Sequence, residues 1–396
     1  MGSKKGAGAW EIVISRKGAP ARAETDPRSE RRPRGGAFAR ALRATMSTAA
    51  ETPELVRKSS RNSLEDALDV DVEDLQTLGT YILNTAVDED TTDLSILIQT
   101  IGTSCKYIAN CVRKLGLARL AGKAGATNVQ GEEQMKLDVV AHEVFSRSLV
   151  RSKRCTAMVS EEVEEVIPCV SSRDGRYVCV YDPLDGSSNI DCSVSIGSIF
   201  GIYKASEKGK FDEKDTLQPG RDMVAAGYAL YGSACNLVLT IGGSVQGFTL
   251  DSSLGEFVLT HPNIAVPRKG KIYSVNEGNS RWWSKGMSEY VNHVKFKDEP
   301  HSLRYIGSMV ADVHRTLMYG GTFSYPSDAK SPDGKLRLLY ECFPMAYIME
   351  KAGGMASTGS SRILDVVPKH IHQRMPIHMG SVEDILDIER FLAASE

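Results

Sequence analysis

Residues 181–189 read Tyr-Asp-Pro-Leu-Asp-Gly-Ser-Ser-Asn and follow the apolar run at residues 177–180. Pro183 stops strand pairing, and Gly186 turns the chain into a segment of free hydroxyl and amide groups. Two carboxylates at the end of a buried strand, Asp182 and Asp185, suit a hard divalent cation. Backbone N–H groups of the Gly-Ser-Ser segment can hold a phosphate beside that cation. The alternative interpretation is an Asx-rich turn without a ligand.

Other acidic residues stand in contexts that favour the metal interpretation. Glu161 and Glu162 follow a short apolar stretch, Glu132 and Asp138 flank the start of an expected helix, and Glu341 lies in the apolar segment 336–344. Taken singly, each of these residues would be interpreted as a solvent-exposed charge on the surface. Burying several like charges is prohibitive unless cations neutralise them. We therefore predict a joint carboxylate metal site.

The hydrophobic periodicity predicts a layered α/β body that begins near Val70. Apolar residues spaced three and four positions apart indicate a helix that is capped by Thr92 or Asp93 and extends to residue 115. The same spacing indicates a second helix over 133–150 and a third over 338–352, which ends at Gly353. Short apolar segments with Gly punctuation indicate strands at 177–181, 194–203, 224–231, 236–241, 245–250 and 256–260. A subdomain boundary is expected near 262–270.

The composition excludes several classes of protein. The chain has 396 residues and a formal net charge of −2, but residues 1–58 carry +7 and the remainder −9. An acidic body disfavours a nucleic-acid partner. No run of 18 apolar residues is present, so no membrane-spanning helix is expected. Eight cysteines without a CxxC pair suit small buried residues in a reducing compartment.

The basic N-terminal region, residues 1–65, is expected to be a disordered extension. It is rich in Arg, Ala, Gly and Ser. An organelle transit peptide, an N-terminal arm, and sequence upstream of a second start at Met46 remain open, because its acidic residues count against a transit peptide. We expect a cytoplasmic location, with organelle import through this extension as the alternative.

Several motifs across residues 75–392 together resemble fructose-1,6-bisphosphatase, a member of the lithium-sensitive sugar and inositol phosphatase superfamily. The Asp182-Pro-Leu-Asp-Gly string is shared by the superfamily, whereas two C-terminal strings are specific to the bisphosphatase. The motifs are Asp182–Asn189, Leu137–Val139, Ser160–Glu162, Gln218–Gly220, Asn276–Gly278, Arg304–Arg315 and Gly334–Glu341.

The resemblance implies an αβαβα fold with two subdomains, residues 66–265 with the metal site and 266–396 with the sugar and 6-phosphate site. It implies hydrolysis of the 1-phosphate of fructose 1,6-bisphosphate, with two to three ions of Mg²⁺, Mn²⁺ or Zn²⁺ per subunit. The implied metal ligands are Glu132, Glu161, Asp182, Leu184 (through its carbonyl), Asp185 and Glu341. Relatives often have Asp where this chain has Glu132.

The resemblance also assigns the remaining site residues. Asp138 and Glu162 would position and deprotonate the attacking water, and Arg337 would offset charge beside the 1-phosphate. Substrate would be bound by Asp185, Gly186, Ser187, Ser188, Asn276, Arg304, Tyr305, Met309, Tyr325 and Lys335. Because Arg304 matches a residue that reaches into a neighbouring subunit, a homo-oligomer is implied, either a tetramer or a dimer.

The segment that matches the family's AMP site departs from the family pattern. Thr91 and Tyr177 are retained, but Lys204 replaces an Arg, and Asp90 adds negative charge. Because Lys lacks the bidentate phosphate contact of Arg, we expect weakened or lost AMP inhibition. Two other functions compete with the bisphosphatase: a sedoheptulose-bisphosphate or inositol-phosphate phosphatase, and a non-catalytic regulator that uses the basic extension to bind partners.

Overall fold

The structure is a computed structural model that describes residues 75–115, 122–127, 133–169 and 174–395. The chain divides into two units, residues 1–69 and 70–396, and every element described below belongs to the second unit. The expected N-terminal extension, Met46 and Glu132 lie outside the described residues.

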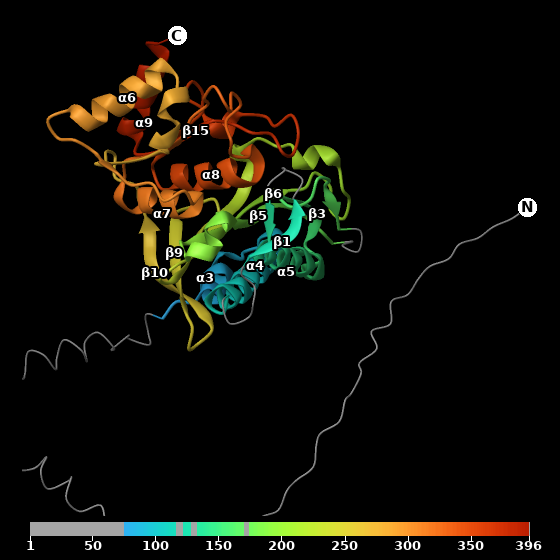
Figure 1. Ribbon diagram of the computed structural model, residues 1–396. Coiled ribbons are helices and arrows are strands. Elements are labelled where there is room, and N and C mark those ends of the chain that lie inside the picture. Colours follow the sequence, from blue (N-terminus) through green and yellow to red (C-terminus); the bar gives the residue numbers. More distant parts are fainter. Residues whose placement is uncertain (1–74, 116–121, 128–132, 170–173, 396) are drawn as a thin grey trace, which may run out of the picture. The chain divides into compact units, whose positions relative to one another are not determined.

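The larger sheet has eight strands in the spatial order β10-β9-β8-β7-β6-β5-β3-β4 (Figure 1). Their bounds are β3 Cys155–Ser160, β4 Ile167–Pro168, β5 Tyr177–Asp185, β6 Ile196–Lys204, β7 Met223–Tyr231, β8 Cys235–Thr240, β9 Val245–Asp251 and β10 Glu256–Ile264. These strands confirm the segments that the sequence predicted. Every residue of β5 is buried, because layers cover this strand on both faces, and its sequence is therefore apolar without alternation.

The parallel pairing of β3 and β5 positions the acidic residues. Ser160 of β3 lies opposite Tyr181 of β5, so Glu161 and Asp182 follow at the same edge of the sheet. A two-stranded sheet, β1 (Lys123–Thr127) with β2 (Glu133–Met135), precedes the helix that leads into β3.

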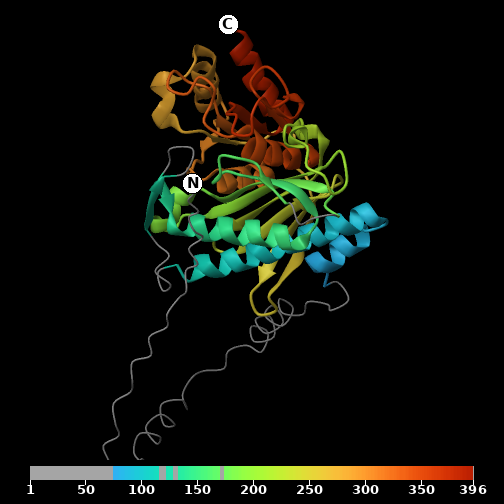
Figure 2. The same ribbon diagram turned by 90° about the vertical axis from the view of Figure 1, so that its right-hand side faces the viewer.

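Helices α4 (Glu89–Arg113) and α5 (Lys136–Ser152) lie side by side against one face of the large sheet (Figure 2). The short helix α3 (Leu78–Thr85) packs on α4. Apolar residues of these helices and of the sheet form one buried cluster, in which Leu97, Ile101 and Phe145 take part. The second helix was predicted from residue 133, but residues 133–135 form β2 and α5 begins at Lys136.

The predicted cap of α4 is wrong. The helix begins earlier, after Asp88, whose carboxylate accepts the N–H of Thr91 at 2.7 Å. The Thr91 hydroxyl in turn accepts the backbone N–H of Asp88 at 3.0 Å, so the pair forms a capping box. Thr92 and Asp93 therefore lie within the helix, and Asp93 is buried in an ion pair with Arg154 at 2.9 Å.

The opposite face of the large sheet is covered by α7 (Met309–Tyr319) and α8 (Phe343–Lys351). A five-stranded sheet in the order β12-β11-β13-β15-β14 forms the next layer. Its bounds are β11 Ile272–Ser274, β12 Ser302–Leu303, β13 Thr322–Tyr325, β14 Met355–Ser357 and β15 Ile377–Gly380. Helices α6 (Lys285–Phe296) and α9 (Val382–Ala393) pack together beyond it. The resulting order of layers is the αβαβα fold that the resemblance implied.

The expected helix over 338–352 is divided. Residues Leu338–Cys342 form a π-helical turn that leads into α8. The chain leaves this helix at Gly353, whose φ of +83° matches the predicted glycine stop. A π turn inside a helix often occurs at a functional site, and this one carries Glu341.

All eight cysteines are free, as the sequence predicted. Five of them are buried, and Cys192 is exposed. Within the described residues, no helix combines the length and the apolar character that crossing a membrane requires.

Candidate active site

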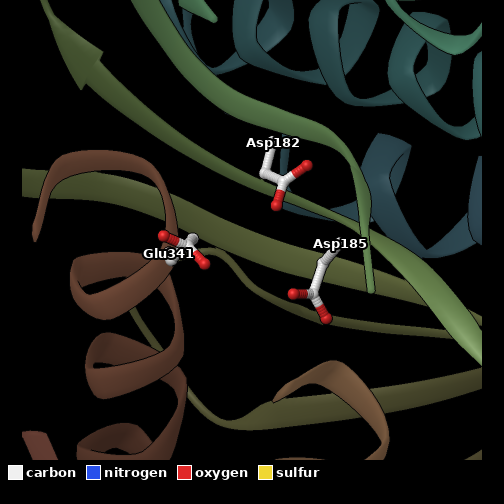
Figure 3. Close-up of side chains that lie close together, drawn as sticks. All are labelled: Asp182, Asp185 and Glu341. Carbon is white, nitrogen blue, oxygen red and sulfur yellow. The ribbon is translucent and has the colours of Figure 1, made fainter. Parts of the chain in front are cut away.

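Three buried carboxylates meet where β5 ends and the π turn begins. Asp182 and Asp185 come from β5 and Glu341 from the turn, and each offers an oxygen within 4.8 Å of the others. Figure 3 shows the three carboxyl groups facing a common space. All three side chains are at most 7% exposed, so the surrounding solvent offsets little of their mutual repulsion.

Burial, together with mutual repulsion, raises the proton affinity of this cluster. Burial raises the pKa of Asp182 well above its usual range, and the charges of Glu161, Asp185 and Glu341 add to the effect. Burial and the Glu341 charge raise the pKa of Asp185 to about 7. The cluster therefore has to bind either protons or a cation, and carboxylate oxygens are the ligands that Mg²⁺ and similar hard ions prefer.

A buried arginine lies beside the same carboxylates. Arg337 forms ion pairs with Glu161 at 3.1 Å and with Glu341 at 3.8 Å. Its backbone N–H also donates to the Glu341 carboxylate at 2.5 Å. One guanidinium compensates one charge, so it leaves most of the negative charge of the cluster in place.

Hydrogen bonds fix the three acidic residues next to the cluster, Glu161 and Glu162 through their backbone N–H groups and Asp138 through its carboxylate. Glu161 donates its N–H to the carbonyl of Tyr181 at 3.2 Å, which fixes the end of β3 against β5. Glu162 donates its N–H to the Ser160 hydroxyl. Asp138 lies in the first turn of α5 and accepts the N–H of Met135 at 2.8 Å.

These groups line one pocket with a cavity volume of about 560 Å³. Of the residues implied by the resemblance, it gathers Asp138, Glu161, Glu162, Asp182, Leu184, Asp185, Gly186, Ser187, Ser188, Tyr305, Met309, Tyr325, Lys335, Arg337 and Glu341. The lining contains several acidic residues, and Lys335 with Tyr305 and Tyr325 supplies hydrogen-bond donors for an anion. A pocket of this kind suits a small anionic substrate held beside a cation.

The comparisons with known proteins agree with this geometry. A family model described as "Fructose-1-6-bisphosphatase, N-terminal domain" matches residues 76–262, and the model of the C-terminal domain matches residues 266–393. The chain belongs to the fructose-1,6-bisphosphatase family. The buried carboxylate cluster lies at the junction of the two matched segments, since Asp182 comes from the first and Glu341 from the second.

Several named fructose-1,6-bisphosphatases are similar to the whole described body. The cytosolic enzyme of Oryza coarctata is 56% identical over 326 residues, which cover 81% of this chain and 95% of the relative. The cytosolic enzyme of Solanum tuberosum is 55% identical over 338 residues, covering 84% and 99%. The crystal structure of Leishmania major fructose-1,6-bisphosphatase in holo form matches with a TM-score of 0.77 and 45% identity, covering 80% of this chain and 98% of that one.

Two residues implied by the family resemblance, Asn276 and Arg304, do not line this pocket, and the structure does not describe a third, Glu132. Asn276 lines a small neighbouring pocket together with Tyr325. Arg304 is exposed and donates from its guanidinium to the carbonyl of Leu303 at 2.8 Å. Glu132 lies outside the described residues. Their roles in this family member stay predictions.

The turn at Gly186 explains why the family motif requires glycine there. Its φ is +77°, and a Cβ would lie 2.9 Å from the Ser308 hydroxyl oxygen. Ser187 and Ser188 follow directly at the edge of the pocket, at the start of a short 3₁₀ helix, Ser187–Cys192. The glycine thus lets the chain reverse close to the 308 turn and present both hydroxyls to the pocket.

Sequence reasoning missed Asp312, which also lines the pocket. Its buried carboxylate accepts the N–H groups of Ile306 and Gly307 at 3.0 Å, and it forms an ion pair with Arg315 at 2.5 Å. It therefore fixes the turn that carries Tyr305. Its position within the Arg304–Arg315 motif was the available signal. Other pocket-lining residues without an assigned role are Met135, Asp191, Gly307, Phe323 and Leu336.

The residues at the family's AMP segment are engaged within the chain. Tyr177 donates its hydroxyl to the Asp90 carbonyl at 2.6 Å. The Asp90 carboxylate forms ion pairs with both Lys204 and Arg176. The Thr91 hydroxyl belongs to the capping box of α4. Each group expected to contact a nucleotide therefore already has a partner in this structure.

Proposed function

We propose that this chain hydrolyses the 1-phosphate of fructose 1,6-bisphosphate to give fructose 6-phosphate and phosphate. One observation carries the proposal. The buried Asp182, Asp185 and Glu341 cluster opens into the same pocket as Lys335 and Tyr305, so a single substrate can meet a reaction centre and a second anion site.

The donor set supports a divalent metal cofactor. The buried carboxylates with raised pKa values need positive charge, and we propose Mg²⁺, with Mn²⁺ or Zn²⁺ as alternatives, in two to three ions per subunit. The groups proposed to hold it are Glu132, Glu161, Asp182, Asp185, Glu341 and the Leu184 carbonyl. When bound, such ions lower the pKa of water and polarise phosphoryl oxygens.

The chain's own residues would orient the reactants at the 1-phosphate. Ser187 and Ser188 present hydroxyl groups that can donate hydrogen bonds to phosphate oxygens. Asp138 and Glu162 are carboxylates at the pocket wall and would accept the proton of the attacking water. Arg337 lies within reach of the carboxylates and would offset the charge that accumulates on the phosphoryl group.

The 6-phosphate end would be bound rather than transformed. Lys335 is exposed at the pocket mouth and supplies a point charge. Burial raises the pKa of Tyr305, and proximity to Tyr325 adds to this, so the Tyr305 hydroxyl stays protonated as a donor. Asn276 and Met309 complete this end. We propose that Arg304 acts across a subunit interface in a homo-oligomer, a tetramer or a dimer.

The test is phosphate release from fructose 1,6-bisphosphate, sedoheptulose 1,7-bisphosphate and inositol 1-phosphate, each with Mg²⁺ and with chelator. We expect fructose 1,6-bisphosphate to be hydrolysed at least about tenfold faster than inositol 1-phosphate, because only a bisphosphate uses both phosphate ends of the pocket. We also expect it to be hydrolysed faster than the longer sedoheptulose 1,7-bisphosphate. Equal rates on the monophosphate would overturn the substrate assignment. Rates that chelator leaves unchanged would overturn the metal assignment.

We also propose weak or absent inhibition by AMP. Asp90 forms ion pairs with both Arg176 and Lys204, and Arg176 also pairs with Glu89 and Asp93. An AMP phosphate would therefore have to displace ion pairs and approach negative charges. An activity titration with AMP measures this directly. Inhibition in the micromolar range would contradict the proposal.

For the organisation of the chain we propose a basic extension (1–65), a metal-site subdomain (66–265) and a sugar subdomain (266–396), in a cytoplasmic protein. The relatives named above are described as cytosolic, which supports this location. Fluorescent fusions of the full chain and of a variant starting at Met46 would test the alternative, which is organelle import through the extension. A full-length fusion found in an organelle would reverse the assignment.

A further inference from the structure

A second groove, with a cavity volume of about 640 Å³, lies between residues 332–333 and residues 369–376. Within the described part of the chain it shares no lining residue with the catalytic pocket. Lys369, His370 and Arg374 line it, against a single carboxylate, that of Asp333. Its lining is therefore cationic, although the body of the chain carries a net negative charge.

The cations of this groove are not compensated by ion pairs. Lys369 and Arg374 form none with any carboxylate among the residues that the structure describes. Burial lowers the pKa of the neighbouring His372, although its hydrogen bonds to the carbonyls of Glu164 and Val163 oppose this effect.

These properties fit a phosphate group. Uncompensated positive charge in a concave surface concentrates anions. An arginine fork can bind two phosphate oxygens at once, and a lysine adds a flexible point charge. The cavity volume lies within the range of about 300–1,000 Å³ that small-molecule sites occupy. A phosphate ester of sugar size or smaller fits both the charge and the volume.

The groove is joined by its backbone to the catalytic segment. The carbonyl of Gln373 accepts the N–H of Leu338 at 2.7 Å, and Met375 donates its N–H to the carbonyl of Leu336 at 3.0 Å. These two hydrogen bonds flank Arg337, which lies opposite Arg374 in a backbone bridge. A ligand that shifts Arg374 would therefore also shift the backbone of Arg337, whose guanidinium is proposed to act in catalysis.

A histidine of the groove extends this connection to the other catalytic segment. His372 Nε2 lies 3.1 Å from two carbonyl oxygens, those of Val163 and Glu164. Because a carbonyl oxygen only accepts hydrogen bonds, Nε2 carries the proton and donates it. Its Nδ1 then accepts the hydroxyl of Tyr340 at 2.9 Å. His372 thus ties the loop that follows Glu162 to the π turn.

We propose that this groove is a regulatory anion site, which binds a small phosphate ester and thereby changes kcat through residues 373–375.

The kinetic test uses glycerol 3-phosphate, with glycerol as the uncharged control and Mg²⁺ in constant excess. At saturating fructose 1,6-bisphosphate, a compound that only competes for the catalytic pocket leaves kcat unchanged. We expect glycerol 3-phosphate to change kcat by at least about twofold, because the groove lies outside that pocket. The effect should disappear in the double variant Lys369→Gln/Arg374→Gln. It should persist in the matched control Arg151→Gln/Lys153→Gln, which removes two exposed cations at the end of α5.

Titration calorimetry on the Mg²⁺-loaded enzyme supplies a readout that does not depend on turnover. We expect the double variant to lose at least about tenfold in affinity for glycerol 3-phosphate, since it lacks two charge-assisted contacts. The proposal is overturned if wild-type kcat does not respond, or if the double variant binds as tightly as the control. Failure of the bisphosphatase assignment would leave the binding result intact, so the two failures are distinguishable.

Discussion

Replacing Asp185 by asparagine should stabilise the metal-free protein at alkaline pH while abolishing catalysis. Asp185 is 7% exposed, and burial and the Glu341 charge raise its pKa to about 7. The folded state therefore holds this proton more tightly than the unfolded chain does. The stability that this provides is complete below the unfolded pKa and is lost as the pH rises to about 7. The asparagine amide would stay neutral at every pH, and its oxygen could still accept the Val310 N–H that Asp185 accepts at 2.8 Å.

The size of the effect follows from the proton affinity. The unperturbed pKa is 3.8 and the folded value is about 7. Because each tenfold change in affinity corresponds to about 1.4 kcal/mol, the ionised side chain costs the fold about 4 kcal/mol above pH 7. Relaxation of the cluster makes this an upper bound, so we expect Asp185→Asn to raise the free energy of unfolding by about 2–4 kcal/mol at pH 8. At pH 4 the difference should be small, because Asp185 is then protonated in the folded protein.

Urea unfolding in excess chelator at pH 4 and pH 8 measures this difference directly. Asp298→Asn provides the control, because it removes an exposed carboxylate and should leave stability unchanged at both pH values. Adding Mg²⁺ at pH 8 should stabilise wild type more than Asp185→Asn, since the ion binds the ionised carboxylate. The reasoning is refuted if Asp185→Asn is no more stable than wild type at pH 8, or if its advantage is equal at both pH values.

Three further changes test other parts of the site. Lys335→Ala should raise KM for fructose 1,6-bisphosphate more than it lowers kcat, because the lysine binds a phosphate that is not transferred. Steady-state assays measure both constants, and a loss confined to kcat would contradict this role. Asp90→Asn should release Lys204 from its ion pair and so strengthen AMP inhibition, and unchanged AMP titrations would exclude Asp90 as the cause of weak inhibition. Gly186→Ala should lower the free energy of unfolding by about 1–3 kcal/mol in urea titrations, through its positive φ and its contact with Ser308, whereas wild-type stability would show that the turn relaxes.

The strands and layers could be predicted because their signal is local. Residues 177–181 are apolar without alternation, and the structure buries the whole of β5, as a central strand requires. The start of α4 could not be placed in the same way. Thr92, Asp93 and Asp88 are all acceptable cap residues by type, and only the reciprocal bonds between Asp88 and Thr91 decide between them.

The candidate site was partly predictable for a different reason. Asp182 and Asp185 share one strand, so three residues of sequence fix their separation. Glu341 is far away in sequence and joins them only because the π turn packs against β5. The sequence indicated it only through its place in the apolar segment 336–344, and the family motif added its role as a metal ligand. Asp312 accepts hydrogen bonds from backbone N–H groups of a turn. No charge pattern in the sequence distinguishes such an aspartate from one that forms an ion pair at the surface.

The two phosphate sites that we propose share cations without a carboxylate partner among the described residues. Lys335 in the catalytic pocket and Lys369 in the second groove form no ion pair among the described residues, so a phosphate meets their full charge. Lys204, in contrast, already forms an ion pair with Asp90. A charge that is already paired contributes little to binding another anion, because the old contact has to be broken first. The pairing of each cation, and not the number of cations, therefore predicts where this protein binds phosphate.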